Sequence, residues 1–282
     1  MSLAIGIDVG ASTIKGALLS DGQVLTESTG RTFGQTEFKE SFATLTQVID
    51  TLWQPEVQKI GIVTTGDVDA KAGVVTYAIN LPGWTNAPLK ALLEKRYAVP
   101  VYLENDAVGA LLAEASLLPR CKKITMLTFG TGLGSANLSD GKLVKDPRYA
   151  WANRKLHPED TFTAEQVLSA TALKRDAKRT YGKTIFTLDL FRRCRKGESR
   201  ADAVFQRFSD SLVALFAIIE QDFAPDAIVL GGGIMNGKDV IETYLKGCPY
   251  PYRFAFYGNL AGAIGATMLP IDSREWNKGE EI

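Results

Sequence analysis

One arrangement of residues occurs twice in this chain and constrains its fold more than any other feature. The first copy has four parts in order: residues 3–9, 10–13, 14–19 and the dipeptide Asp21-Gly22. The second copy has the same four parts: residues 124–129, 130–134, 135–138 and the dipeptide Asp140-Gly141. Apolar runs read as strands, and Asp-Gly between such runs is a strong hairpin signal. The pattern therefore predicts two strand, glycine turn, strand and hairpin units, which indicates an internal duplication.

Between and after the two copies, segments with strand character alternate with segments with helical periodicity. We expect further strands at 59–63, 100–103 and 225–230, and a hairpin within 68–80. We expect helices at 36–53, 88–97, 163–181, 200–223, 239–246 and 259–269, and directly after Asp106. Residues 142–160 show no periodicity. Alternating strands and helices predict an α/β fold. We expect an N-terminal domain at 1–117 and a C-terminal domain at 118–270. In an alternative division, residues 271–282 also belong to the N-terminal domain.

Charge and cysteine content exclude several classes of protein. The 282 residues hold 32 Lys and Arg against 32 Asp and Glu, which argues against a nucleic-acid binder that works through a broad basic surface. The three cysteines are far apart and only one histidine is present, so no thiolate zinc site or disulfide framework is indicated. Asp8 and the glycines interrupt any signal-peptide core, and no apolar run is long enough to span a membrane. We expect a cytoplasmic protein with no membrane partner.

The turn at residues 10–13 has the chemistry of a phosphate site. It can present backbone N–H groups, the Ser12 and Thr13 hydroxyls and the Lys15 ammonium to an anion, while Asp8 faces the same point. Backbone nests and a lysine suit phosphate oxygens, and a nearby carboxylate suits the Mg²⁺ that accompanies them. An ordinary hairpin with a polar tip is the alternative for this stretch alone.

Three glycine-rich turns follow predicted strands, at 10–13, 130–134 and 231–233. Glycine permits close approach of the backbone to a ligand, although each turn alone reads equally as a tight turn. In this order the three turns favour binding of a polyphosphate nucleotide. None of them matches the P-loop or the dinucleotide-binding fingerprint, so neither of those enzyme classes is favoured.

Asp106 is the candidate catalytic base. It follows a predicted strand and begins a predicted helix, which is where loops meet at the edge of an open α/β sheet. Phosphoryl transfer to a hydroxyl needs positioning, charge neutralisation and one carboxylate that accepts the alcohol proton. The alternative is that Asn105 or Asp106 caps the helix, and a cap and a base are compatible roles.

Five segments in order resemble the ROK sugar kinases of the actin-like ATPase superfamily: IGIDVGASTIKGALL, INLPGW, LENDAVGALLAE, TFGTGLG and IVLGGGI. The resemblance implies two actin-like, ribonuclease H-like domains with ATP, Mg²⁺ and a small-molecule sugar in the cleft, and a homodimer. By matching positions it implies nucleotide contacts from Asp8 (to Mg²⁺ through water), Gly10, Ala11, Ser12, Thr13, Lys15, Gly130, Thr131, Gly132, Gly231, Gly232 and Gly233. It implies sugar contacts from Gly66, Asn80, Asn105, Asp106 and Glu165, with Asp106 as the base.

The chain departs from the family pattern most in one segment, and it also differs at residues 64–67 and 135–137. Typical members carry a Gly-Glu-x-Gly-His stretch and a cysteine-rich motif that binds zinc and shapes the sugar pocket. The equivalent residues here, 144–168, contain no cysteine and no Gly-Glu pair, so we expect no structural zinc. Glu165 and Ser169 match the end of that motif only loosely.

We therefore expect an ATP-dependent kinase that phosphorylates a hydroxyl, the 6-OH, of a hexose or N-acetylhexosamine, with N-acetylmannosamine or glucose preferred. A sugar sensor or degenerate kinase of the same fold is the alternative, supported by the altered segment. A third reading is an actin-like ATPase without a sugar. Asn80 and Asn105-Asp106, with the aromatic Trp84 in the same group, argue against that third reading because such sets suit carbohydrate.

Overall fold

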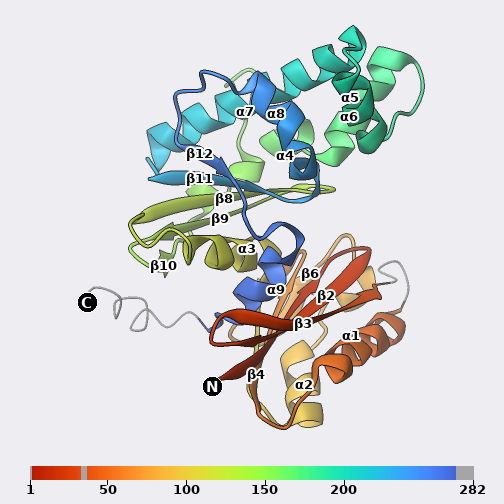
Figure 1. The fold of residues 1–282 in the computed structure, drawn as a ribbon, viewed down its shortest axis with the longest axis vertical. Helices are drawn as coiled ribbons and strands as arrows, with labels where there is room; N and C mark the ends of the chain where they lie inside the picture. Colours follow the sequence, from red (N-terminus) through yellow and green to blue (C-terminus); the bar gives the residue numbers. More distant parts are fainter. Residues whose placement is uncertain (1, 33–36, 271–282) are drawn as a thin grey trace. The chain divides into compact units, whose positions relative to one another are not determined.

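The computed structural model describes residues 2–32 and 37–270 (Figure 1). The chain forms two compact units. Unit 1 consists of Met1–Pro119 together with Asn259–Ile282, and unit 2 of Arg120–Gly258. Residues 259–270 thus belong to unit 1, whereas the sequence pattern assigns them to the C-terminal domain. The predicted contribution of 271–282 lies outside the described residues.

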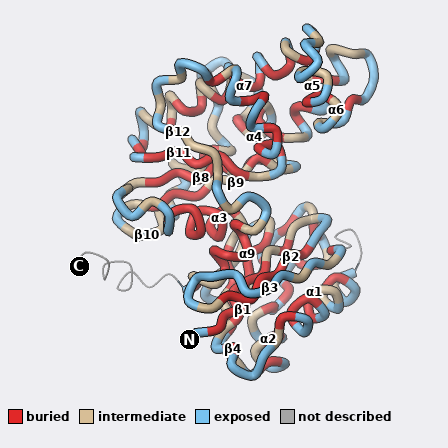
Figure 2. Tube along the Cα trace, in the orientation of Figure 1, coloured by how far each residue is buried: buried red, intermediate tan, exposed pale blue. Residues whose placement is uncertain are grey.

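Unit 1 is built on a five-stranded sheet in the order β3-β2-β1-β4-β7. Its strands are β1 (Leu3–Val9), β2 (Thr13–Ser20), β3 (Gln23–Arg31), β4 (Val57–Thr64) and β7 (Val101–Asn105). The first three strands are antiparallel neighbours, while β4 is parallel to β1 and β7 to β4. Figure 2 shows β1 and β4 largely buried and the edge strand β3 largely exposed. The Asp21-Gly22 turn has positive φ at both residues, as a hairpin of the predicted kind requires.

The two faces of this sheet are covered in different ways. Side chains alternate along a strand, so Ile5 and Ile7 of β1 point to one face and Gly6 to the other. The isoleucines join the apolar cluster that α1 (Phe38–Leu52) and α2 (Leu89–Tyr97) complete. The opposite face carries α3 (Asp106–Ala115) and α9 (Ala261–Ala266). The remaining elements are the hairpin β5 (Asp67–Asp69) and β6 (Val74–Tyr77), η1 (Pro82–Trp84) and η5 (Gly258–Leu260).

Helix α9 packs closely against the backbone of β1, β4 and α3. This packing explains why residues 259–270 group with unit 1 and not with unit 2. A Cβ added to Gly6 would lie 1.8 Å from the Ala263 carbonyl oxygen, and one added to Gly61 would lie 1.7 Å from that of Ala266. On the other side of the helix, a Cβ on Gly265 would lie 1.7 Å from the Gly109 carbonyl oxygen. Glycine at these positions permits the approach. The helix was predicted from periodicity, but no local pattern identifies the unit it joins.

Unit 2 repeats the sheet of unit 1. Its strand order is β10-β9-β8-β11-β12, with the same sequence of antiparallel and parallel neighbours. The strands are β8 (Lys123–Phe129), β9 (Leu133–Ser139), β10 (Lys142–Leu143), β11 (Ala227–Gly231) and β12 (Tyr252–Phe254). The turn at Asp140-Gly141 again has positive φ at both residues. The matching topology agrees with the duplication that the sequence pattern predicts.

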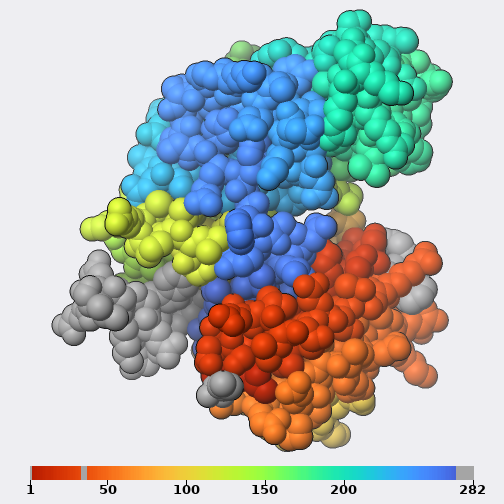
Figure 3. Space-filling model, in the orientation of Figure 1, coloured from red at the N-terminus to blue at the C-terminus, as the bar shows by residue number. Residues whose placement is uncertain are grey.

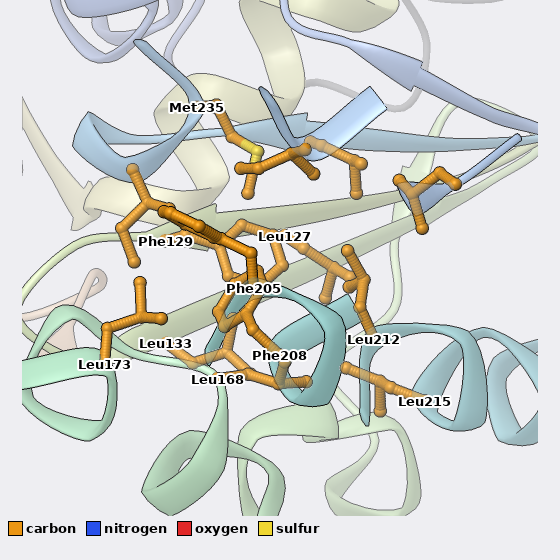
Figure 4. Close-up of a cluster of buried hydrophobic side chains, with 14 of the residues drawn as sticks. Leu127, Phe129, Leu133, Leu168, Leu173, Phe205, Phe208, Leu212, Leu215 and Met235 are labelled. Atoms are coloured by element: carbon orange, nitrogen blue, oxygen red, sulfur yellow. The ribbon is translucent and has the colours of Figure 1, made fainter. Parts of the chain in front are cut away.

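Helices pack against the unit 2 sheet through a continuous apolar core (Figure 4). They are α4 (Ala164–Val167), α5 (Ala170–Tyr181), α6 (Thr187–Arg195), α7 (Ser199–Asp222) and α8 (Lys238–Tyr244), with η4 (Gly233–Gly237) before α8. Phe205, Phe208 and Leu212 of α7 point toward Leu127 and Phe129 of β8 in Figure 4. The single helix predicted at 163–181 is wrong, because Ser169 accepts the Ala172 N–H and starts a new helix. Helix α6 was not predicted.

The segment at 144–168, where the resemblance implies a zinc motif in typical members, is anchored by a buried tryptophan. Trp151, in the short helix η3 (Trp151–Asn153), is fully buried, and its indole N–H donates to Asn137 Oδ1 at 2.7 Å. The same oxygen accepts the Thr125 hydroxyl at 2.9 Å, and the Asn137 amide donates to the Tyr149 carbonyl at 3.0 Å. A satisfied polar group and a large apolar side chain fix this stretch to β8 and β9.

Among the described residues, no helix has the length and apolarity needed to cross a bilayer.

Candidate functional site

Asp8 and Lys15 form the centre of the site in unit 1. They are opposite each other in the antiparallel register of β1 and β2. The Lys15 ammonium lies 3.7 Å from the Asp8 carboxylate, and the Asp8 side chain is only 18% exposed. Burial raises the pKa of Asp8 above its usual range, and the Lys15 charge opposes that rise. A bound cation would stabilise the charged form of this desolvated carboxylate.

Asp106 begins α3, directly after β7, as predicted. Asn105 is the N-cap: its side-chain oxygen accepts the Ala107 N–H at 2.9 Å, and Asp106 Oδ1 accepts the same N–H at 2.8 Å. Burial, followed by the negative charge of Asp8, raises the pKa of Asp106 to about 7. The cap and the candidate base are therefore adjacent residues, each making its own bond to the helix terminus. A carboxyl with a pKa near neutrality is suited to proton transfer at neutral pH.

Among the described residues, no group of three or more acidic, histidine or cysteine side chains could hold a metal ion. Asp8 and Asp106 are nevertheless oxygen donors of the kind that magnesium prefers. Asp106 experiences the charge of Asp8, and both carboxyls have raised pKa values because they are withdrawn from water. A divalent cation that prefers oxygen ligands would relieve this repulsion. Asp8 is the residue that would hold the ion.

Gly262 of α9 borders the Asp8 carboxylate. A Cβ built on Gly262 would lie 2.8 Å from both Cγ and Oδ2 of Asp8. The atoms in the way are the end of a side chain, unlike the backbone atoms that face Gly265. The absence of a side chain at position 262 thus leaves the space that the Asp8 carboxylate occupies. Sequence reasoning missed this residue, since the contact depends on the packing of α9.

Two of the predicted sugar-contact residues, Gly66 and Asn105, are in contact with each other. The Asn105 amide donates to the Gly66 carbonyl at 2.9 Å, so the cap of α3 is tied to this turn. Gly66 has φ of 98°, and a Cβ there would lie 2.2 Å from the Tyr77 carbonyl oxygen of β6. Asn80 is half-buried and follows this hairpin two residues after Ala78. Gly66 and Asn105 are therefore in contact with each other, and Asn80 follows the same hairpin.

Trp84 does not belong to this group, which corrects the sequence analysis. Its side chain is fully buried in the core of unit 1, and the indole N–H donates to the Ser41 hydroxyl at 2.6 Å. The ring packs edge-on against Phe38, with centroids 5.6 Å apart. The local sequence Pro-Gly-Trp does not indicate whether the Trp84 ring faces the ligand or the core.

The turn at Gly10–Thr13 is closed by a backbone hydrogen bond and exposes its two hydroxyl residues. The Gly10 N–H donates to the Thr13 carbonyl at 3.0 Å, and Ala11 lies half-buried between them. Ser12 and Thr13 are exposed. Thr32, which was not predicted and directly follows β3, supports the turn: its buried hydroxyl donates to the Gly10 carbonyl at 2.7 Å.

In unit 2 the glycine turns line a cavity of about 300 Å³. Its walls come from the turn after β8, the start of α5, helix α6 and η4, and its lining residues are Gly130, Thr131, Ala170, Thr187, Leu188, Phe191, Arg195, Gly233, Ile234, Asn236 and Gly237. An apolar wall with a few polar groups is typical of a site for a small organic ligand. The contribution of α6 was missed because the helix itself was not predicted.

The three glycines 231–233 have different roles. Gly231 ends β11 and is buried, with Met126 in the space that a side chain would need. Gly232 has φ of 88°, and a Cβ there would lie 2.6 Å from backbone atoms of Phe129. Only Gly233 lines the cavity. The first two glycines shape the turn, and the third can face a ligand.

Glu165 lies against the turn after β8. The Leu133 N–H donates to Glu165 Oε1 at 3.3 Å, and a Cβ on Gly132 would lie 2.2 Å from that oxygen. Glu165 belongs to unit 2, while Gly66, Asn80, Asn105 and Asp106 belong to unit 1. Its carboxylate contacts the glycine turn, which gives it a structural contact besides the sugar contact that the resemblance implies.

Comparison with known proteins gives consistent matches. The sequence profile that describes the ROK family matches residues 4–148 and 161–272. The chain is 27% identical over 270 residues to a glucokinase of Thermotoga maritima, covering 86% of this chain and 85% of that protein. It is 27% identical over 288 residues to an N-acetylmannosamine kinase of Escherichia coli, covering 94% and 97%.

Among solved structures, a ROK family glucokinase from Streptomyces griseus in complex with glucose and AMPPNP superposes with a TM-score of 0.81. The two chains are 24% identical, and the match covers 95% of this chain and 99% of that one. The likeness shows the shared fold, which has the two-domain actin-like architecture that the sequence predicted.

Proposed function

The chain belongs to the ROK family, and from that premise we propose that it is an ATP-dependent carbohydrate kinase. The acceptor is a hexose or N-acetylhexosamine, phosphorylated on its 6-OH, with glucose or N-acetylmannosamine as the preferred sugar. The observation that carries the proposal is Asp106, a half-buried residue at the start of α3, whose pKa is raised to about 7 by desolvation and by the charge of Asp8. The matched glucokinase and N-acetylmannosamine kinase support the choice of sugars.

In this proposal Asp106 accepts the proton of the sugar hydroxyl as its oxygen attacks the terminal phosphorus of ATP. Asn105, Gly66 and Asn80 bind neighbouring hydroxyls, so the attacking oxygen is oriented before it reacts. Lys15 and the N–H groups of the turn at 10–13 neutralise charge that develops on the phosphates. Mg²⁺, when bound, supplies further neutralisation of the donor phosphates.

The nucleotide is assigned to unit 2 residues that line one cavity. The turn at 130–132 would hold phosphate oxygens through its backbone N–H groups. Leu188, Phe191 and Ile234 would pack against the adenosine, with Gly233 leaving room for close approach. We also propose that the protein is located in the cytoplasm and forms a homodimer.

A coupled assay of ADP release over a panel of sugars tests this function. The panel contains glucose, N-acetylmannosamine, N-acetylglucosamine and fructose, each with ATP and Mg²⁺. Sugar-dependent ADP release, with a sugar 6-phosphate as the product, is the expected result. Absence of turnover with every sugar contradicts the proposal.

A sugar sensor without turnover is the second candidate function. The engagement of Glu165 by the Leu133 N–H favours it, because that carboxylate contacts the glycine turn and has one fewer free oxygen for a sugar. Thermal unfolding in the presence of each sugar separates the two candidates. A sugar-dependent rise in Tm with no ADP release indicates the sensor, and a rise with release indicates the kinase.

Gly262→Ala is expected to lower kcat by about 10–100-fold, because the new methyl group displaces the Asp8 carboxylate. The concentration of Mg²⁺ at half-maximal rate should rise, and the KM of the sugar should stay close to that of the wild type. Steady-state kinetics at several Mg²⁺ concentrations measure both effects.

Gly265→Ala is the matched control on the same helix. Its methyl group meets the backbone of Gly109 and not Asp8, so the Tm should fall while the Mg²⁺ dependence of the folded enzyme is kept. Wild-type kinetics in the Gly262→Ala variant would remove Gly262 from the positioning of Asp8.

Chelation should separate stability from turnover. Because Trp151 and Asn137 anchor the segment at 144–168, treatment with EDTA is expected to leave the Tm of the free protein unchanged. The same treatment should stop ADP release, and excess Mg²⁺ should restore it. A large fall in Tm that zinc reverses would contradict the expectation of no structural zinc.

A further inference from the structure

One face of helix α6 lines the cavity of unit 2 over about two turns. The lining residues of this helix are Thr187, Leu188, Phe191 and Arg195. Residues three and four apart lie on the same side of a helix, so these four side chains follow one stripe from the first residue of α6 to the last. Leu188 and Phe191 suit an organic ligand, whereas Arg195 brings a cation into a largely apolar wall.

The guanidinium group of Arg195 is held in one orientation by Asp239. Arg195 Nε donates to Asp239 Oδ2 at 2.7 Å, and Arg195 Nη2 donates to Asp239 Oδ1 at 2.8 Å. The hydrogen bond from Arg195 also holds the pKa of Asp239 below its usual range, so the carboxylate stays ionised. The segments of α6 and α8 adjoin in unit 2, blue-green and blue in Figure 3. A pair of parallel hydrogen bonds fixes the plane of the guanidinium group.

The ring of Phe191 supports this plane from one side. The central guanidinium carbon of Arg195 lies over the ring, 5.8 Å from its centroid. Phe191 is buried and stacks on Phe205 with centroids 4.6 Å apart, and a side chain at Gly237 would collide with its ring. The support is therefore rigid. Because the Arg195 side chain lines the cavity and is 46% exposed, part of the guanidinium group is open to a ligand.

The charges decide which part of a nucleotide lies against Arg195. A phosphate that approached the guanidinium group would also approach the Asp239 carboxylate, and two negative charges repel each other. A neutral heterocycle has no such penalty, and the flat guanidinium group stacks on aromatic faces. The backbone turn at Gly130 and Thr131, on another wall of the same cavity, is the candidate phosphate site. The base is therefore the part that fits beside Arg195.

We propose that Arg195 stacks on the base of the nucleotide and makes the enzyme prefer purine donors to pyrimidine donors. The two fused rings of a purine cover more of the guanidinium plane than the single ring of a pyrimidine. Asp239 is a positioning residue, because it acts through Arg195. The inference rests on the proposed kinase function and adds a base-selective residue to the same nucleotide site.

The test measures kcat and KM of the full-length protein with ATP, GTP, CTP and UTP at a saturating concentration of the best sugar. The wild type should have a higher kcat/KM with the two purine nucleotides. Arg195→Ala should raise the KM for ATP and GTP by about 10-fold and the KM for CTP and UTP by about 3-fold or less. The kcat and the KM of the sugar should be unchanged. An equal rise with all four nucleotides overturns the inference, because ribose and phosphates are common to them.

Two further variants separate the flat surface from the charge and from its support. Arg195→Lys keeps the charge without the plane, so the purine preference should be lost as in Arg195→Ala, with a Tm close to that of the wild type. Retention of the preference overturns the inference. Asp239→Asn should raise the KM for ATP less than Arg195→Ala does, and the double variant should be no worse than Arg195→Ala alone. Additive losses would contradict the role of Asp239.

Arg192→Ala is the matched control on the same helix. Arg192 also pairs with an aspartate, Asp189, and lies outside the set of described residues that line the cavity. The control should keep the wild-type KM for every nucleotide, and a loss equal to that of Arg195→Ala overturns the inference.

Calorimetry with ADP and CDP in the absence of sugar makes the result independent of turnover. Tighter binding of ADP than of CDP, removed by Arg195→Ala, supports the stacking role even where no sugar is phosphorylated and the kinase function fails. Turnover without a purine preference overturns the inference and leaves the kinase function intact. Absence of both nucleotide binding and turnover refutes the two together.

Discussion

Asp106→Asn is expected to lower kcat by about 10²–10⁴-fold, the usual contribution of a general base. Asparagine has nearly the same shape, but its amide cannot accept the proton of the sugar hydroxyl. The hydrogen bond to the Ala107 N–H can be kept by the amide oxygen, so the start of α3 should remain intact. ATP binding, measured by calorimetry, should change little. Glu56→Gln, at an exposed site of unit 1, is the control and should keep the wild-type rate.

The same variant should be more stable than the wild type at alkaline pH. The pKa of Asp106 is about 7 in the folded protein, against an ordinary value of 3.8, so the unfolded chain ionises more readily. Stability associated with this group is present below pH 3.8 and is lost as the pH rises through 7. The Tm of Asp106→Asn without Mg²⁺ should exceed that of the wild type at pH 8 by several degrees. The difference should shrink toward pH 4.

Two results would contradict this account of Asp106. A kcat within about tenfold of the wild type would exclude Asp106 as the base. A Tm difference that does not depend on pH would mean that the carboxyl is not perturbed by burial and by Asp8. Kinetics and thermal unfolding thus test the same residue by separate properties.

Trp151→Ala should lower the free energy of unfolding by about 3–5 kcal/mol, the usual cost of removing a large buried side chain. The indole ring is fully buried against Tyr149 and Phe223, with ring centroids 5.4 and 6.5 Å away, and it donates to Asn137. Its loss leaves a cavity and removes one donor from a buried amide oxygen. Urea unfolding followed by circular dichroism, fitted to separate transitions of the two units, measures the effect.

Trp151→Phe is the matched control. It retains most of the apolar volume and removes the hydrogen bond, so it should cost much less than Trp151→Ala, about 1–2 kcal/mol. Asn137 keeps its bond from the Thr125 hydroxyl in both variants. A loss below about 1 kcal/mol in Trp151→Ala would show that the segment at 144–160 does not depend on this anchor.

The parts of the fold that the sequence predicted are those with local chemical causes. Asp21-Gly22 and Asp140-Gly141 adopt positive φ because that turn needs it, and the two sheets follow from the strands on either side. The position of Asp106 was equally predictable. A polar residue between a buried strand and an apolar helix lies at the end of the strand, at the edge of the sheet.

The errors concern features set by distant residues. Helix α6 spans only nine residues and buries only Leu190 and Phe191, with Leu188 69% exposed, so its apolar stripe is too short to stand out in the sequence. Trp84 has the same local surroundings whether it faces a sugar or Ser41. Gly262 and Glu165 act through contacts with residues 254 and 33 positions away, at Asp8 and Gly132. No spacing along the chain encodes these contacts.

The origin of α9 has a consequence for how the protein is made. The sheet of unit 1 emerges first from the ribosome, yet the helix that closes one of its faces begins only at Ala261. Translation of the intervening residues takes on the order of ten seconds. During that time the face of β1 and β4 that carries Gly6 and Gly61 is uncovered, while unit 2 can already collapse. Unit 1, which bears Asp8 and Asp106, therefore receives helix α9 only after the whole of unit 2 has been synthesised.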